Sequence, residues 1–184
     1  MVARETNDVF LVCLAQTDVA IAEMREGQLD LARAHLEETI AVAEQVGNVL
    51  ALTYLWSHLG DVLVLQQRCN EAAAPIRRSL IECRRRGMST SMATEVANLA
   101  YCASRASDPT TASLLYGSAD AMFTAHAARG QRVAREEACA SLWSDDQSRL
   151  RGLLGDEEYE RLHRNGGELT LEETVRLCLR QLQS

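Results

Sequence analysis

The sequence contains no lysine, two prolines and few aromatic residues. All 19 basic residues are arginines, a bias typical of a GC-rich bacterial genome. Aromatic residues make up 4% of the chain and hydrophobic residues 47%, so the interior must be built mainly from alanine, leucine, valine and isoleucine. The chain has few β-branched runs that could form strands, and its two prolines, Pro75 and Pro109, provide few turns between strands. The composition therefore predicts an all-α protein.

Basic charge and long apolar runs are also scarce. The formal net charge is -7, and a nucleic-acid groove needs a basic stripe that displaces counterions, so we expect no direct nucleic-acid binding. No apolar run reaches the roughly 18 residues of a membrane span. The amino terminus lacks the charged-then-apolar pattern of a signal peptide. The sequence predicts a cytoplasmic protein without membrane association.

The six cysteines form no CxxC pair, and no histidine pair at metal-ligand spacing accompanies them. We expect small buried apolar side chains in a reducing cytoplasm, with no metal and no cofactor. These cysteines are Cys13, Cys69, Cys83, Cys102, Cys139 and Cys178.

Small residues recur with a period of 40 residues. One column holds Ala20, Gly60 and Ala100, and another holds Ala32, Ala72 and Ala112. Two apolar columns accompany them: Val19, Leu59 and Leu99, and Leu36, Ile76 and Tyr116. A fixed period of roughly 20 to 50 residues indicates stacked repeats, in which no unit buries its apolar face alone.

Helix-ending residues divide the repeats into three helix hairpins over residues 1–130. Gly47 and Gly87 close the first two hairpins and Gly130 the third, while Asn48 and Asp108 can cap helices that begin just after them. Beyond Gly130 the register stops. We expect residues 131–184 to form capping helices of the same domain: one to residue 154, one from 156 to about 164, and one after 170. Between the last two stands a strong helix breaker, residues 165–167.

The period suits HEAT or armadillo repeats, whereas the small-residue columns suit tetratricopeptide repeats, in which the two helices of a hairpin touch. Trp56, Leu59 and Gly60 also follow the W-x2-L-G order of tetratricopeptide repeats. The predicted fold is a tetratricopeptide-like, all-α superhelix of antiparallel helix hairpins with a carboxy-terminal helical cap.

Several segments resemble the tetratricopeptide-repeat regions of bacterial transcriptional regulators of the LuxR and maltose-activator type, which are signal-transduction ATPases. The segments are residues 27–29 with Ala32 and Leu36, residues 41–44, residues 112–121, and the Gly-Glu-Leu-Thr-Leu-Glu-Glu-Thr-Val run of residues 167–175. In that family, such a region follows an ATPase module and often precedes a helix-turn-helix. This chain has no phosphate-binding GxxxxGK[ST] loop. ATP binding is therefore not carried over from the family. Because the helical pattern begins almost at residues 1–3, we expect a piece of a longer polypeptide or a shortened relative.

If the first helix of each hairpin lines a concave groove, as the resemblance implies, the chain offers a set of binding candidates. Tyrosines there present apolar bodies with polar tips, and charged groups orient a ligand. The candidates are Thr17, Ile21, Met24, Tyr54, Ser57, Asp61, Tyr101 and Arg105. The alternative for each is ordinary packing or a solvated position.

Other features have two interpretations. A run of arginines could dock an anion or form a solvated helix face, and Trp56 and Trp143 could anchor an interface or lie in the core. The arginines are Arg77, Arg78, Arg84, Arg85 and Arg86. No histidine has a catalytic partner at a suitable spacing in the sequence. The one catalytic arrangement that the sequence does not exclude is a Cys–His pair brought together by the fold, such as Cys102 with His58.

The sequence predicts no enzyme. It predicts a module that binds a protein or peptide partner, or senses a small effector, in a bacterial signalling or transcriptional regulator. The alternative is a homodimerisation scaffold, in which an uncovered amino-terminal helix face or the groove pairs with a second copy.

Overall fold

The computed structural model describes residues 2–130 and 137–181. All regular elements of these residues are α-helices, and the prediction of antiparallel helix hairpins without strands is confirmed. The helices are α1 (Val2–Arg25), α2 (Leu29–Gln45), α3 (Val49–Leu65), α4 (Cys69–Arg86), α5 (Ser89–Arg105), α6 (Pro109–Ala128), α7 (Glu137–Leu154), α8 (Asp156–Gly167) and α9 (Leu171–Gln181). None of these described helices is both long and apolar enough to cross a membrane.

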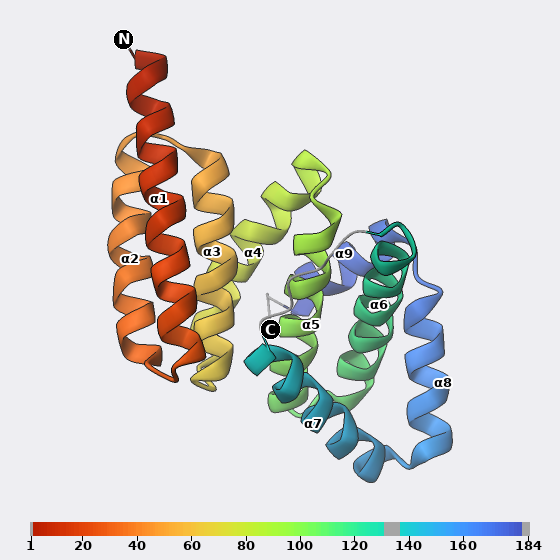
Figure 1. Ribbon diagram of the computed structural model, residues 1–184. Helices are drawn as coiled ribbons and strands as arrows, with labels where there is room; N and C mark the ends of the chain where they lie inside the picture. The colour runs from red at the N-terminus through yellow and green to blue at the C-terminus, as the bar shows by residue number, and fades with distance from the viewer. Residues whose placement is uncertain (1, 131–136, 182–184) are drawn as a thin grey trace. The chain divides into compact units, whose positions relative to one another are not determined.

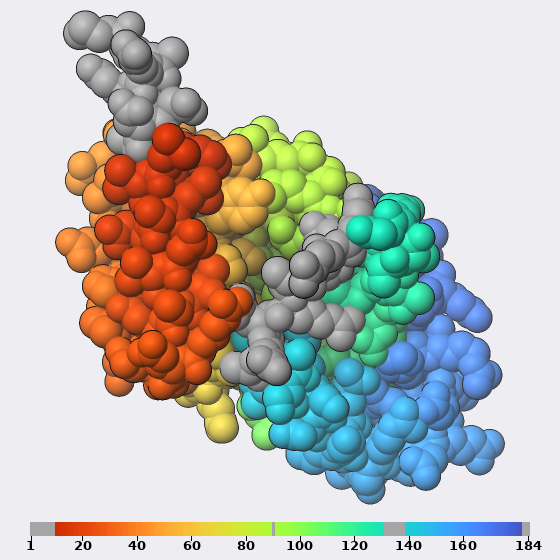
Figure 2. Space-filling view, viewed as in Figure 1, coloured from red at the N-terminus to blue at the C-terminus, as the bar shows by residue number. Residues whose placement is uncertain are grey.

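The chain divides into two compact units, residues 1–79 and 80–184. The division falls within α4, whereas the sequence analysis places the end of the repeats at residue 130. That repeats and cap form one domain stays a prediction. In the first unit, α1 and α2 form a hairpin and α3 packs against both, as Figure 1 shows. α1 lies on the surface of this unit in the space-filling view (Figure 2).

Local sequence explains where the helices begin and turn. The Asn48 side chain accepts a hydrogen bond from the backbone N–H of Ala51 (3.1 Å), and Asp108 accepts one from Thr111 (3.0 Å). The turns repeat in phase as well: positions 27, 67 and 107, which are 40 residues apart, all have left-handed backbone, with φ of 77°, 59° and 64°. Only the first is glycine, so the repeat imposes this conformation on Gln67 and Ser107.

The two small-residue columns are buried throughout, which lets the helix backbones approach closely. The Leu36, Ile76 and Tyr116 column is buried too. The other apolar column is not uniform, because Val19 on α1 is 44% exposed whereas Leu99 is 1% exposed. In the first unit this arrangement gives a continuous core of small and branched side chains: Cys13, Ala20, Met24, Ala32, Leu36, Ala43, Ala51, Leu52, Leu55 and Val62.

In the second unit, α5 and α6 form a hairpin, α8 packs against α6, and both α7 and α9 contact α5 and α6. The predicted breaker at residues 165–167 is wrong, because α8 continues through Gly167. Gly166 serves instead for close packing: a Cβ atom there would lie 2.0 Å from the carbonyl oxygen of Leu114. The predicted start of α9 is confirmed by a capping box in which Thr170 and Glu173 bond each other's backbone N–H groups (2.9 and 3.3 Å).

Candidate ligand-binding cavity

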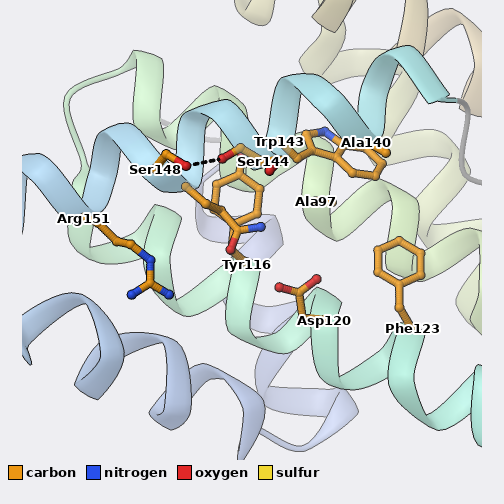
Figure 3. Close-up of a pocket in the computed structure, with 10 residues that line it drawn as sticks. Ala97, Tyr116, Asp120, Phe123, Ala140, Trp143, Ser144, Ser148 and Arg151 are labelled. Atoms are coloured by element: carbon orange, nitrogen blue, oxygen red, sulfur yellow. Dashed lines mark hydrogen bonds between the residues drawn. The ribbon is translucent and has the colours of Figure 1, made fainter. Parts of the chain in front are cut away.

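The second unit contains a cavity of about 370 Å³. One side is α6 and the other is α7, with α5 contributing Ala97. Most of the lining side chains carry polar or charged groups, and those on α7 follow one face of the helix at spacings of three and four residues (Figure 3). The lining residues are Ala97, Tyr116, Asp120, Phe123, Ala140, Trp143, Ser144, Gln147, Ser148 and Arg151.

Two opposite charges line the cavity, and each is held by α8. The Asp120 carboxylate lies 3.1 Å from Nε2 of His163, and its side chain is 38% exposed. The Arg151 guanidinium pairs with Glu160 (2.5 Å) and lies 4.5 Å from the ring centroid of Tyr159; its side chain is 41% exposed. Both charges are therefore fixed in position by neighbours and still reach solvent.

Gln147 and Tyr116 are oriented by hydrogen bonds outside the cavity. The Tyr159 hydroxyl donates to Oε1 of Gln147 (2.7 Å), so this amide keeps its NH₂ group as a donor. The Tyr116 hydroxyl donates to Oδ2 of Asp146 (3.2 Å). Burial, followed by the charge of Asp146, raises the pKa of Tyr116 well above its ordinary value. Tyr116 therefore stays a neutral donor at physiological pH.

Behind Tyr116 lies a polar network centred on Asp146, whose side chain is 1% exposed. Oδ1 of Asp146 accepts hydrogen bonds from Ser104 (2.9 Å), Arg105 and Nε of Arg149 (3.0 Å). Because the partners come from α5, α6 and α7, this buried carboxylate connects all three helices that line the cavity. Such a charge is tolerated only where it is fully hydrogen-bonded.

The apolar end of the cavity is formed by an aromatic pair. The Phe123 and Trp143 rings stack with their centroids 6.3 Å apart, and Trp143 is 3% exposed. The indole nitrogen of Trp143 is closed off from solvent and has no hydrogen-bond partner among the described residues. Trp143 therefore belongs to the core and also lines the cavity. Trp56 packs against the core of the first unit.

Six of the eight predicted groove residues belong to the first unit. The Thr17 hydroxyl donates to the carbonyl of Cys13 (2.7 Å), and Met24 is part of the core, so neither presents free binding groups. Asp61 is 2% exposed and lies 3.4 Å from Nδ1 of His58. Ser57 is buried, while Ile21 and Tyr54 are half-buried. Their role in binding stays a prediction.

The other two predicted residues, Tyr101 and Arg105, lie together in the second unit. The Arg105 guanidinium stands over the Tyr101 ring, 5.0 Å from its centroid, and bonds Asp146. The structure thus brings Arg105 next to the cavity wall without placing it in the lining. His58 belongs to the first unit and Cys102 to the second.

Sequence reasoning missed Asp120, Gln147 and Arg151. A signal for the α7 residues exists, because Ser144, Gln147, Ser148 and Arg151 are polar residues at helical spacing on a helix of the cap. No comparable pattern marks Asp120 as a binding residue. It lies within residues 112–121, which resemble a motif of the regulator family.

Four of the five arginines of α4 form ion pairs with carboxylates of this chain. Arg78 pairs with Glu44 (3.5 Å), Arg84 with Glu172 (2.6 Å), and Arg85 and Arg86 both pair with Glu82 (2.9 and 3.6 Å). These pairs are mostly exposed, as in a solvated helix face. They favour that interpretation over an anion site.

Four cysteines are buried, and Cys69 and Cys102 are intermediate. Burial raises the pKa of Cys178 to about 12, which makes its thiol unreactive. Within the described part of the chain, no group of three or more histidine, cysteine, aspartate or glutamate side chains is placed to hold a metal ion.

Comparison of the chain with protein-family models, curated proteins and solved structures gives no match. The kinship with LuxR-type and maltose-activator-type regulators therefore rests on sequence motifs and stays a prediction.

Proposed function

We propose that the chain is a non-catalytic effector-sensing module of a bacterial signalling or transcriptional regulator, and that the cavity between α6 and α7 is its sensing site. The observation that carries this proposal is the polar lining of the cavity. Small-molecule sites use polar groups at fixed positions to orient the ligand, and here fixed charges and oriented donors surround a space of about 370 Å³.

The geometry supplies a way to transmit binding. A ligand in contact with Asp120 and Arg151 would join α6 to α7, and the Asp146 network already joins α7 to α5. Binding would therefore favour the arrangement in which these helices are packed as described. A ligand shifts such an equilibrium only by the difference in its affinity for the two states.

The resemblance of residues 112–121 and 167–175 to regulator motifs supports the proposed context. The first segment forms half of α6 and includes two lining residues, Tyr116 and Asp120, and the second spans the junction of α8 and α9. An effector site in this part of the chain fits a sensor attached to other modules.

A cavity-filling variant tests the proposal. Ala140→Trp places an indole in the cavity, and Ser141→Trp adds the same group at an exposed neighbouring position on α7 as the matched control. A metabolite library screened by thermal shift should yield compounds that raise the Tm of the native chain and of Ser141→Trp, but not of Ala140→Trp. A library without such compounds, or compounds that stabilise all three proteins equally, would contradict the proposal.

A homodimerisation scaffold is the second candidate, because α1 carries an uncovered apolar face. Leu11 and Val12 are 58% and 55% exposed, whereas their counterparts 40 residues later, Ala51 and Leu52, are 1% and 6% exposed. In α3 this face packs against the preceding hairpin. The same face of α1 is therefore shaped to receive another helix pair, and a second copy could supply it.

Sedimentation equilibrium distinguishes this candidate. Dimerisation through α1 predicts a concentration-dependent mass that Leu11→Glu reduces to the monomer, while Ala22→Glu at the other end of the helix has a smaller effect. If the protein is a monomer at all concentrations, the homodimerisation proposal is wrong, and the sensing proposal is unaffected.

A further inference from the structure

We infer that the ligand of the cavity is a compact zwitterion, of the class of the free amino acids, with its ammonium group at Asp120 and its carboxylate at Arg151 and Gln147. This inference rests on the proposed function and specifies its ligand class.

The placement of the two charges carries the first step. Asp120 contacts His163 and Arg151 contacts Tyr159, and these two α8 residues are four positions apart, with rings 5.6 Å from each other. Neighbouring turns of α8 therefore hold one negative and one positive group at the same cavity. In Figure 3 they lie on either side of Tyr116.

An amino acid carries both charges on one small molecule. Its nitrogen and carboxylate oxygens are separated by about 3 Å, and each can form a charge-assisted hydrogen bond of about 2.8 Å to its own side of the cavity. A molecule with one charge would leave the opposite side of the cavity unmatched.

The hydrogen-bonding polarity supports the same orientation. The carboxylate of Asp120 only accepts hydrogen bonds, as an ammonium group requires. At the other end, Gln147 keeps its NH₂ donors because Oε1 accepts from Tyr159. Both ion pairs of Arg151 with α8 carboxylates use Nη1. The guanidinium fork can therefore also donate to a ligand carboxylate.

The cavity has room for a side chain. A water molecule occupies about 30 Å³ in the liquid, and the cavity of about 370 Å³ is many times larger. The exposed lining is mostly polar, and its smaller apolar part is formed by Ala97, Phe123, Ala140 and Trp143. An amino acid with an aliphatic side chain of moderate size, such as L-leucine, places its apolar part there.

Three probes with one carbon skeleton test the inference on the full chain. L-Leucine has both charges, L-leucinamide lacks the carboxylate, and 4-methylpentanoate lacks the ammonium group. L-Alanine and L-serine extend the set to smaller zwitterions. The readout is the indole N–H resonance of Trp143 in ¹H–¹⁵N spectra, with Trp56 of the first unit as the internal reference. Trp56→Phe and Trp143→Phe assign the two signals.

We expect zwitterions to shift the Trp143 signal and to bind at least about tenfold more tightly than either singly charged analogue. Asp120→Asn and Arg151→Gln should each weaken the binding of L-leucine by a similar factor. The matched controls, Asp145→Asn and Arg176→Gln, change the same charges at exposed positions and should leave its Kd unchanged. The ligand series needs no substitution, so it stays informative if a variant does not fold.

Three results overturn the inference. In the first, no zwitterion moves the Trp143 signal. In the second, L-leucinamide or 4-methylpentanoate binds as tightly as L-leucine. In the third, Asp120→Asn and Arg151→Gln bind L-leucine normally. If library compounds of another class still bind in a manner that Ala140→Trp abolishes, the sensing function stands and only the ligand class is wrong.

Discussion

Gly117 on α6 and Gly166 on α8 lie in one helix crossing, and each faces the backbone of the opposite helix. A Cβ atom on Gly117 would lie 1.9 Å from the carbonyl oxygen of His163, and one on Gly166 would lie 2.0 Å from that of Leu114. No side chain fits between these backbones. The crossing also fixes the part of α8 that holds Asp120 and Arg151 at the cavity.

Gly117→Ala should destabilise the second unit, because the added methyl group meets rigid backbone. We expect a loss of about 3 kcal/mol in the free energy of unfolding, at the upper end of overpacking effects. Urea denaturation measures it. Gly152→Ala on α7 is the control, since no atom lies within 4 Å of its Cβ position; it should be neutral or stabilising by up to about 1 kcal/mol. Equal effects of the two substitutions would show that α6 and α8 do not cross this closely.

Asp146→Ala should also destabilise the second unit. It leaves the Tyr116 hydroxyl buried without its acceptor and leaves Arg105 and Arg149 without their shared carboxylate. Since both arginines remain partly exposed, we expect the free energy of unfolding to fall by about 2 to 3 kcal/mol. Asp145→Ala, at the exposed neighbouring position, should stay within about 0.5 kcal/mol. Urea denaturation of both variants separates a central role of Asp146 from a general effect of removing charge from α7.

The capping box of α9 should respond to acid. The hydrogen bonds from Thr170 lower the pKa of Glu173 below its ordinary value. A carboxylate with a depressed folded pKa stabilises the fold above its unfolded pKa, and this contribution is lost as the pH falls through the folded pKa. NMR titration should therefore find Glu173 protonating at lower pH than an exposed glutamate, and Thr170→Ala should return the value toward normal. A normal pKa in the unsubstituted chain would contradict the capping geometry.

The Cys178 thiol should be inert in the native protein. Its pKa of about 12 leaves almost no thiolate at neutral pH, and the side chain is 0% exposed. We expect iodoacetamide to label Cys178 only at the rate of unfolding, and the intermediate Cys69 to react sooner. Mass spectrometry of peptides from partly labelled protein measures the order. Early labelling of Cys178 would show that α9 opens easily.

Most of the fold could be predicted from the sequence because its determinants are local. Asn48 and Asp108 cap the helices that follow them, and glycines at 27, 47, 87 and 130 adopt the left-handed backbone that ends a helix. The role of Gly166 could not be predicted. A glycine that ends a helix and one that admits another backbone look alike until the crossing partner is known.

The cavity lay beyond sequence reasoning for a related reason. Asp120 comes from α6 whereas Gln147 and Arg151 come from α7. Asp120 and Arg151 are placed by contacts with α8, 9 to 43 residues away along the chain. The repeat register favoured the first helix of each hairpin as the binding surface, whereas the cavity lies between the third hairpin and α7, a helix beyond the end of the register. Periodicity describes the shared scaffold and carries no information on the nonrepeating cap.

The central claim is that the second unit binds a small molecule between α6 and α7. Its most direct test is a titration of the full chain with L-leucine and with pooled metabolites, followed through the indole N–H resonances of both tryptophans. If the cavity binds such a molecule, the Trp143 signal moves in a saturable manner, the Trp56 signal stays in place, and Ala140→Trp abolishes the effect. If the Trp143 signal stays in place with every pool, or if both tryptophans respond alike, the account is contradicted.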